Sequence, residues 1–352
     1  MLAEDARWVT DIVMSAQKHS DAQAYTALLL GHHFVRIAYE GAAALRSANP
    51  YVGWPTLADL LTDQYAAITK RGRHVSKLLD DTQKSSDEVL NDLAAALAKN
   101  SNAFLGKAPK LFRRLETDMG LYRMNGSILG ASIPMSYRLD IDPGHQQRLS
   151  GGPISGISKE WGSTIAVLSA ADLRAPDVHG SIDLSRCDIT TSNQLASRFL
   201  HDKYDPEFPI EVKALLLLLE GDLNTNRWFL PATEAGHKLT VFRARTATIY
   251  HSLSALRKIE RRFSELDSPG MRDLRTLLSG APAGRLMSRE AALVRNRCVH
   301  YEINTPNIQL DPSLPMSGVI EAVYPGSTWE QFNDDVMNVT EQLAEHLCEW
   351  QL

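Results

Sequence analysis

Cysteine is scarce in this chain of 352 residues, which contains only Cys187, Cys298 and Cys348. No two of these form a CxxC pair, so neither a disulfide framework nor a cysteine-rich zinc site is expected. Long apolar runs are also missing, since the longest clean one, Ala214 to Leu219, is far too short to cross a membrane. The first residues lack the basic and then apolar pattern of a secretory signal. These absences predict a cytoplasmic protein with no membrane segment.

Several motifs of nucleotide binding and hydrolysis are absent as well. Gly151 and Gly152 fit neither a GxxxxGK[ST] loop nor a GxGxxG loop, and no GxSxG or HExxH pattern occurs. A phosphate-binding loop of these types, an ordinary serine hydrolase and a zinc site of the HExxH type are therefore disfavoured. We expect no cofactor and no metal ion.

Lysine and arginine are missing from the chain after Arg297, where nine acidic residues follow. The stretch from Val241 to Arg297 is the opposite, with twelve Lys/Arg and only five acids, in a protein of net charge −5. A basic segment inside an acidic protein can bind a polyanion. The pattern also fits a solvated basic helix that packs beside an acidic one, and the sequence leaves both interpretations open.

The sequence predicts a mainly α protein in three parts. Residues 1–120 are expected to form an N-terminal helical domain, because Ala and Leu are frequent and apolar residues recur at helical spacing. Residues 121–205 are richer in Gly, Ser and Pro and predict a small mixed α/β insert. Residues 206–352 return to helical spacing and predict an antiparallel helical bundle.

Local patterns predict individual elements. Alternation of apolar and polar residues predicts strands at 136–142 and 181–189, and a run of Gly and Ser predicts a flexible loop at 150–158. Apolar stripes predict long helices from Thr240 to Phe263 and from Trp329 to Trp350. Thr56 and Ser288 are predicted to cap the starts of helices. Three tryptophans, Trp228, Trp329 and Trp350, are predicted to lie in the core or at an interface.

One segment of the bundle resembles a known motif. It reads LVRNRCVHYEI from Leu293 to Ile303 and contains Arg295-Asn296-Arg297-Cys298-Val299-His300. An Arg, then a polar residue that is often Asn, then a few residues and a His is similar to the hallmark of the HEPN superfamily. The resemblance extends over about 140 residues and implies a HEPN-like bundle at 206–352.

That resemblance implies a metal-independent endoribonuclease, often a toxin or an antiviral defence effector. It also implies a homodimer in which motifs from two copies form one composite active site. RNA, with tRNA as one candidate, is the implied substrate, and an antitoxin or another regulatory protein is an implied partner. Some members keep the fold without activity and serve as binding modules.

The chemistry of RNA cleavage assigns roles to the motif residues. His300 is the candidate general base for the 2′-hydroxyl, and Arg295 is the candidate cation for the phosphoryl oxygens. Asn296 is the candidate residue that orients His300 or the phosphate by hydrogen bonding. On one helix Arg295 and His300 lie about 140° apart, so a helix end or a second copy must bring them together. The candidate substrate-binding residues are Arg297, Tyr301, Arg257, Lys258 and Arg261.

Looser versions of the motif occur at Arg245 to His251 and at Arg138 to His145. Neither has Asn after the Arg, and the first lies inside a regular predicted helix. A non-catalytic alternative also remains open, in which Asn296 and His300 satisfy buried backbone groups and Arg295 pairs with an acid such as Glu302. A third alternative is a small-molecule enzyme that uses residues 121–205.

A second polar group lies near the N-terminus. His33, Arg36 and Glu40 follow His32 at spacings that place the three on one helix face. A salt bridge within the helix is favoured over a metal site or an acid–base site, because no second histidine lies four residues further on.

Overall fold

The protein is described by a computed structural model, which covers residues 1–18, 20–48, 55–80, 83–106, 116–139, 152–172, 182–301 and 308–350. Over these residues the chain is mainly helical and contains one small three-stranded sheet. The predicted mainly α class is therefore confirmed.

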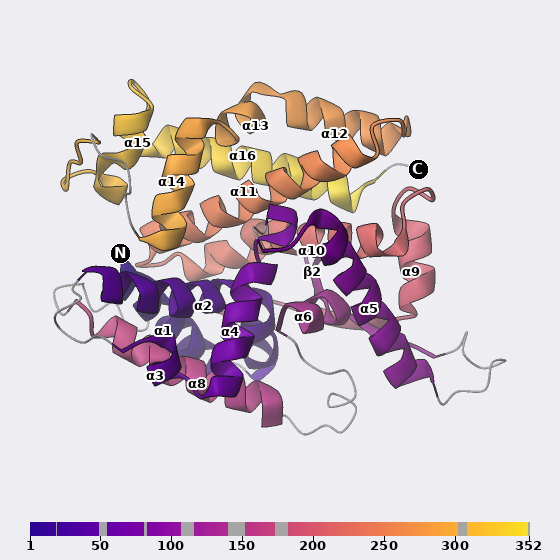
Figure 1. Ribbon diagram of the computed structural model, residues 1–352, viewed down its shortest axis with the longest axis horizontal. Coiled ribbons are helices and arrows are strands. Elements are labelled where there is room, and N and C mark those ends of the chain that lie inside the picture. Colours follow the sequence, from indigo (N-terminus) through magenta and orange to yellow (C-terminus); the bar gives the residue numbers. More distant parts are fainter. Residues whose placement is uncertain are drawn as a thin grey trace.

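The N-terminal part of the chain packs helices α1, α2, α4 and α8 against one another in the lower half of Figure 1. Thr56 caps α3 through a capping box with Asp59, as its position before an apolar repeat predicts. The chain then leaves the helix at Leu61 and Thr62, and α4 begins at Asp63. In the part of the chain before residue 206 that the structure describes, the α-helices are α1 Leu2–Lys18, α2 Ser20–Ala48, α3 Leu57–Leu60, α4 Asp63–Val75, α5 Ser86–Leu105, α6 Ser132–Leu139, α8 Gly152–Ser169 and α9 Ala196–Lys203.

The sheet has the order β2-β1-β3, with both neighbouring pairs antiparallel. Its strands are β1 Met119–Met124, β2 Ser127–Ala131 and β3 Thr190–Gln194. Asn125 and Gly126 join β1 to β2, both with positive φ (52° and 80°). An Asn-Gly pair is the preferred sequence for such a hairpin turn.

Three local predictions in this region are wrong. Residues 136–139 of the first predicted strand belong to α6, and residues 140–142 lie outside the described part of the chain. In the second, residues 182–189 form no strand, and β3 begins at Thr190. In the predicted loop, residues 152–158 form the start of α8.

Segment 136–139 alternates apolar and polar residues as a strand does, but it forms part of α6 because the helix is buried on every side. All residues from Ile133 to Leu139 are buried, so the polar ones find partners inside the protein. The Ser136 hydroxyl donates to the Ser132 carbonyl over 2.7 Å, and Arg138 forms a buried ion pair with Asp222 on α10. Tertiary partners of this kind override the local pattern.

The C-terminal part of the chain is helical throughout its main elements. The stripes that predict two long helices correspond to α11 and α16, which confirms both. These helices, with α12 to α15, fill the upper half of Figure 1. The α-helices described after residue 206 are α10 Ile210–Asn224, α11 Lys238–Arg262, α12 Pro269–Ser279, α13 Ala281–Leu286, α14 Arg289–His300, α15 Val319–Val323 and α16 Trp329–Cys348.

Two hydrophobic cores lie on either side of the sheet. Met119 and Leu121 of β1 contribute to one core, whereas Met124 and Leu129 contribute to the other. Each core takes side chains from before residue 121 and from after residue 205. The three regions therefore share common cores, and the division of the chain into three domains stays a prediction.

Gly221 on α10 lies where the helix touches β2 most closely. A Cβ atom at this position would be 2.8 Å from the Leu129 carbonyl oxygen and 3.1 Å from the Gly130 Cα. Both neighbours are backbone atoms that cannot swing aside. We therefore expect Gly221→Ala to lower the free energy of unfolding by about 1–3 kcal/mol, measured by urea denaturation.

Gly162→Ala is the matched control, because Gly162 lies in the middle of α8, where an added Cβ would meet no neighbour within 4 Å. This change is expected to stabilise the protein by about 0.5–1 kcal/mol, since alanine favours helix. Equal stability of the two variants would contradict the close packing of α10 on β2.

Candidate functional site

The candidate motif occupies the last two turns of α14. The Ser288 hydroxyl accepts a hydrogen bond from the Ala291 amide over 3.1 Å and starts the helix, as predicted. The helix ends at His300, because Tyr301 adopts the left-handed conformation with φ of 58°. Arg297 donates to the Tyr301 carbonyl over 2.7 Å and holds this turn. His300 is therefore the last residue of the helix, and α14 contacts α2. Figure 1 labels both helices.

His300 is held by a carboxylate from a distant part of the chain. Its Nδ1 lies 2.8 Å from Oε2 of Glu40 on α2, and the other oxygen of Glu40 pairs with Arg73 of α4. The His300 side chain is 38% exposed, whereas that of Glu40 is only 9% exposed. Burial alone would raise the pKa of Glu40, but the hydrogen bond from His300 and the charge of Arg73 hold it below its ordinary value. The arrangement fixes the ring through Nδ1 and leaves Nε2 for another group.

Arg295 is directed toward a different neighbour. Its guanidinium carbon lies 4.2 Å from the centre of the Tyr250 ring on α11, which is a cation–π contact. Asn296, which lies between Arg295 and His300 in the motif, is partly buried. The proposed pair with Glu302 lies outside the described residues. Because α14 is a regular helix to its end, Arg295 and His300 point to different sides of it. Within one copy of the chain, Arg295 therefore contacts Tyr250, whereas His300 contacts Glu40.

Tyr301 belongs to a buried network rather than to an open surface. Its hydroxyl donates to Asp5 Oδ2 over 2.7 Å, and burial together with the Asp5 charge raises the pKa of Tyr301 well above its ordinary value. Arg36 bridges α2 to α14 by donating to the Cys298 carbonyl over 2.8 Å and to Asp5 over 3.3 Å. Arg243 of α11 donates to the other Asp5 oxygen over 2.8 Å.

The remaining candidate substrate-binding residues differ in how free they are. Arg257 donates to the Leu278 carbonyl over 3.3 Å, and Lys258 donates to the Leu79 carbonyl over 2.5 Å. Arg297 is partly buried, and burial lowers its pKa. Arg261 is exposed on the last turn of α11. Part of the basic face of α11 thus stabilises the fold.

His251 is a further neighbour of the motif, from the looser match on α11. Its Nδ1 lies 3.7 Å from a carboxylate oxygen of Asp80. Burial, followed by the charges of Arg295 and Arg73, lowers the pKa of His251 to about 4, although Asp80 acts in the opposite direction. His251 is therefore neutral near pH 7, and it places a buried imidazole close to Arg295.

The sequence patterns did not reveal the residues that hold the motif in place. Arg36 and Glu40 share a helix face as predicted, but their ion pairs reach Asp5 on α1 and Arg73 on α4. The favoured salt bridge within the helix is thus not what holds these two side chains. No spacing rule links Glu40 to a histidine 260 positions later.

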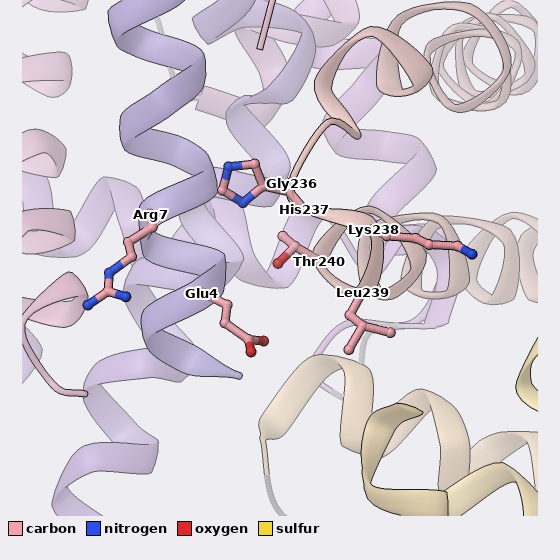
Figure 2. A pocket seen from close by; sticks show the side chains of 7 residues that line it. All are labelled: Glu4, Arg7, Gly236, His237, Lys238, Leu239 and Thr240. Carbon is pink, nitrogen blue, oxygen red and sulfur yellow. The ribbon is translucent and has the colours of Figure 1, made fainter. Parts of the chain in front are cut away.

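A separate hollow of about 310 Å³ opens at the start of α11. It is lined by Glu4, Arg7 and residues 236–240. Figure 2 shows Arg7 and Lys238 pointing away from each other, with Glu4 between them. The two cations do not converge on one point, and the hollow lies outside the motif, so it supports no role in the chemistry considered for His300.

The described residues contain neither a metal-binding cluster nor a membrane-spanning helix. Among the residues described, no group of three or more His, Cys, Asp or Glu side chains is arranged to hold a metal ion. In the same residues, no helix combines the length and the apolar character that a membrane span requires.

Comparisons with known proteins did not identify a relative of this chain. No family model matches the chain, and neither a curated protein nor a solved structure matches it. The likeness to the HEPN superfamily therefore remains a prediction that rests on residues 295–300 and on the helical bundle around them.

Proposed function

We propose that the protein is a metal-independent endoribonuclease of the HEPN type, with a toxin or phage-defence role. His300 acts as the general base and Arg295 stabilises the negative charge that grows on the phosphoryl group. The observation that carries the proposal is the end of α14, where a partly exposed His300 is hydrogen-bonded to the buried carboxylate of Glu40.

The geometry of this pairing suits a histidine that acts as a general base. Glu40 accepts from Nδ1 and so favours the tautomer in which Nε2 is free to take the proton of a ribose 2′-hydroxyl. The same carboxylate stabilises the imidazolium that forms. The activated oxygen then attacks the neighbouring phosphorus and the bond to the 5′-oxygen breaks. The 5′-oxygen takes a proton from water and leaves as a hydroxyl group, and a 2′,3′-cyclic phosphate remains.

The phosphate needs a fixed cation during this step. Arg295 faces Tyr250 within its own chain, so a dimer in which Arg295 of one copy approaches His300 of the other best supplies it. Arg261, which is exposed, and Lys258, which is partly buried, lie on the basic face of α11 and are the candidates for binding flanking phosphates.

The deciding experiment incubates the purified protein with total RNA and with tRNA in the presence of EDTA. The proposal predicts cleavage that survives chelation and leaves 2′,3′-cyclic phosphate ends. Activity that disappears on chelation would overturn the metal-independent mechanism. An intact RNA pool, with the protein folded and bound to RNA or to a partner, would instead favour the non-catalytic binding module.

Arg295→Ala tests the cation. Removing one group that stabilises transition-state charge typically lowers kcat by about 10²–10³-fold, and we expect that loss here. Arg289→Ala is the control, because Arg289 is at the opposite end of the same helix. The two variants should melt within a few degrees of each other. Equal cleavage by both would remove Arg295 from the mechanism.

A further inference from the structure

Arg295 is held by an aromatic ring and not by an acid. Its guanidinium carbon lies 4.2 Å from the centre of the Tyr250 ring. No described residue pairs with Arg295 as a carboxylate or accepts a hydrogen bond from it, and its Nε is buried without a partner. Arg295 as a whole is partly exposed. The side of α14 that faces α11 therefore carries a positive charge that the described part of the chain does not neutralise.

A second arginine lies on a tyrosine ring but also has an acid as its partner. The guanidinium carbon of Arg285 on α13 lies 5.0 Å from the centre of the Tyr324 ring, and Arg285 also pairs with Asp335 of α16 at 2.8 Å. A carboxylate takes up guanidinium N–H groups and cancels the charge, whereas an aromatic face attracts the cation and leaves its charge in place. Arg295 therefore differs from Arg285, because its positive charge is still available to an anionic ligand.

The neighbours of Tyr250 on α11 do not change this balance. Asp80, the carboxylate beside His251, lies 3.7 Å from His251 Nδ1 and 3.6 Å from Lys258 Nζ. The His251 ring is nearly perpendicular to the Tyr250 ring, with 5.7 Å between centroids. Burial lowers the pKa of His251 to about 4, so this imidazole is neutral near pH 7 and does not repel Arg295. A buried neutral ring thus packs against Tyr250 and restricts its movement.

We propose that Tyr250 is a positioning residue, which holds Arg295 ready to bind a phosphate group of RNA. The inference rests on the proposed function and adds the side chain that fixes its cation. An arginine that is already ordered loses less conformational entropy on binding than a mobile one, so it binds a phosphate more tightly. Tyr250 acts only through Arg295 and makes no contact with the reacting atoms.

A double-mutant cycle on RNA binding is the first test. The probe is a fluorescent 2′-O-methyl RNA oligonucleotide, which lacks a free 2′-hydroxyl and so cannot be cleaved by the proposed route. Tyr250→Leu should weaken binding about 3–10-fold, and Tyr250→Phe, which keeps the ring face, should bind like the wild type. In an Arg295→Ala background, Tyr250→Leu should cause no further loss. Equal losses in both backgrounds would overturn the proposal, because Tyr250 would then act independently of Arg295.

Tyr324→Leu is the matched control. It removes a tyrosine ring from an arginine that Asp335 already neutralises, so the affinity for RNA should equal that of the wild type. Binding is measured below the temperature at which the least stable variant begins to unfold. A comparable loss in Tyr324→Leu would contradict the specific role of Tyr250.

The salt dependence of binding reports the number of phosphate contacts, which a purely structural role of Tyr250 would not change. Each contact contributes about 0.7 to the slope of log Kd against log salt concentration for a single strand. Arg295→Ala should reduce the slope by about this amount, and Tyr250→Leu should reduce it in the same direction, whereas Tyr250→Phe should keep it. The full wild-type slope in Arg295→Ala would overturn the phosphate site.

The cleavage assay, run beside the binding assay, separates this inference from the proposed function. Cleavage by the wild type, with equal binding and equal cleavage by Tyr250→Leu, would support the nuclease and overturn the role of Tyr250. No cleavage, with the expected losses of binding, would overturn the nuclease and support a phosphate site at Arg295 that Tyr250 positions. A wild-type protein that does not bind the probe would overturn the phosphate site.

Discussion

Asp5→Ala is expected to lower the free energy of unfolding by about 3–5 kcal/mol. Asp5 is completely buried and accepts hydrogen bonds from Arg36, Arg243 and Tyr301, which come from α2, α11 and the end of α14. Burial alone would raise the pKa of Asp5, but the charges of Arg243 and Arg36 hold it below its ordinary value. The carboxylate is therefore ionised at neutral pH, and its removal leaves two buried cations facing each other.

Urea denaturation of Asp5→Ala beside Glu4→Ala makes this prediction specific. Glu4 is the adjacent acid and also contacts Arg243, over 3.2 Å, but its side chain is 38% exposed. A partly exposed pair contributes about 0–1 kcal/mol, so Glu4→Ala should be close to the wild type. Similar stability of the two variants would show that Asp5 does not join α1 to α14 as the structure indicates.

His300→Ala is expected to reduce RNA cleavage by about 10²–10⁴-fold, the usual contribution of a positioned general base. The folded protein should survive the change, because Glu40 keeps its buried ion pair with Arg73. His300 is also partly exposed, so no deep cavity opens. A selective loss of activity is therefore expected, with urea unfolding close to that of the wild type.

His201→Ala is the matched control for this variant. His201 also pairs with a carboxylate, Asp202 at 2.8 Å, but its side chain is 79% exposed on α9, away from the motif. Cleavage by His201→Ala should equal that of the wild type. Equal cleavage by His300→Ala would indicate a contaminating nuclease or a different active site. Altered assembly of His300→Ala, with no cleavage by the wild type, would favour the binding module.

Local sequence was enough to predict the helices that depend on neighbouring residues. The side chains of Thr56 and Ser288 accept hydrogen bonds from backbone amides three positions later, so a few neighbouring residues are enough to predict these helix starts. The stripes of α11 and α16 repeat at helical spacing for 25 and 20 residues, which is long enough to exclude a strand. The motif around His300 could also be identified from the sequence, because it lies within one short segment.

The surroundings of that motif depend on tertiary packing instead. Glu40 meets His300 across 260 positions, and Asp5 meets Tyr301 across 296. These contacts arise from the packing of α1 and α2 against α11 and α14. The spacing of residues along the sequence does not predict which distant helices pack together. The same cause explains why the prediction for α6 was wrong. Burial against distant helices gave the polar residues of α6 partners and made a helix from a segment whose local sequence favours a strand.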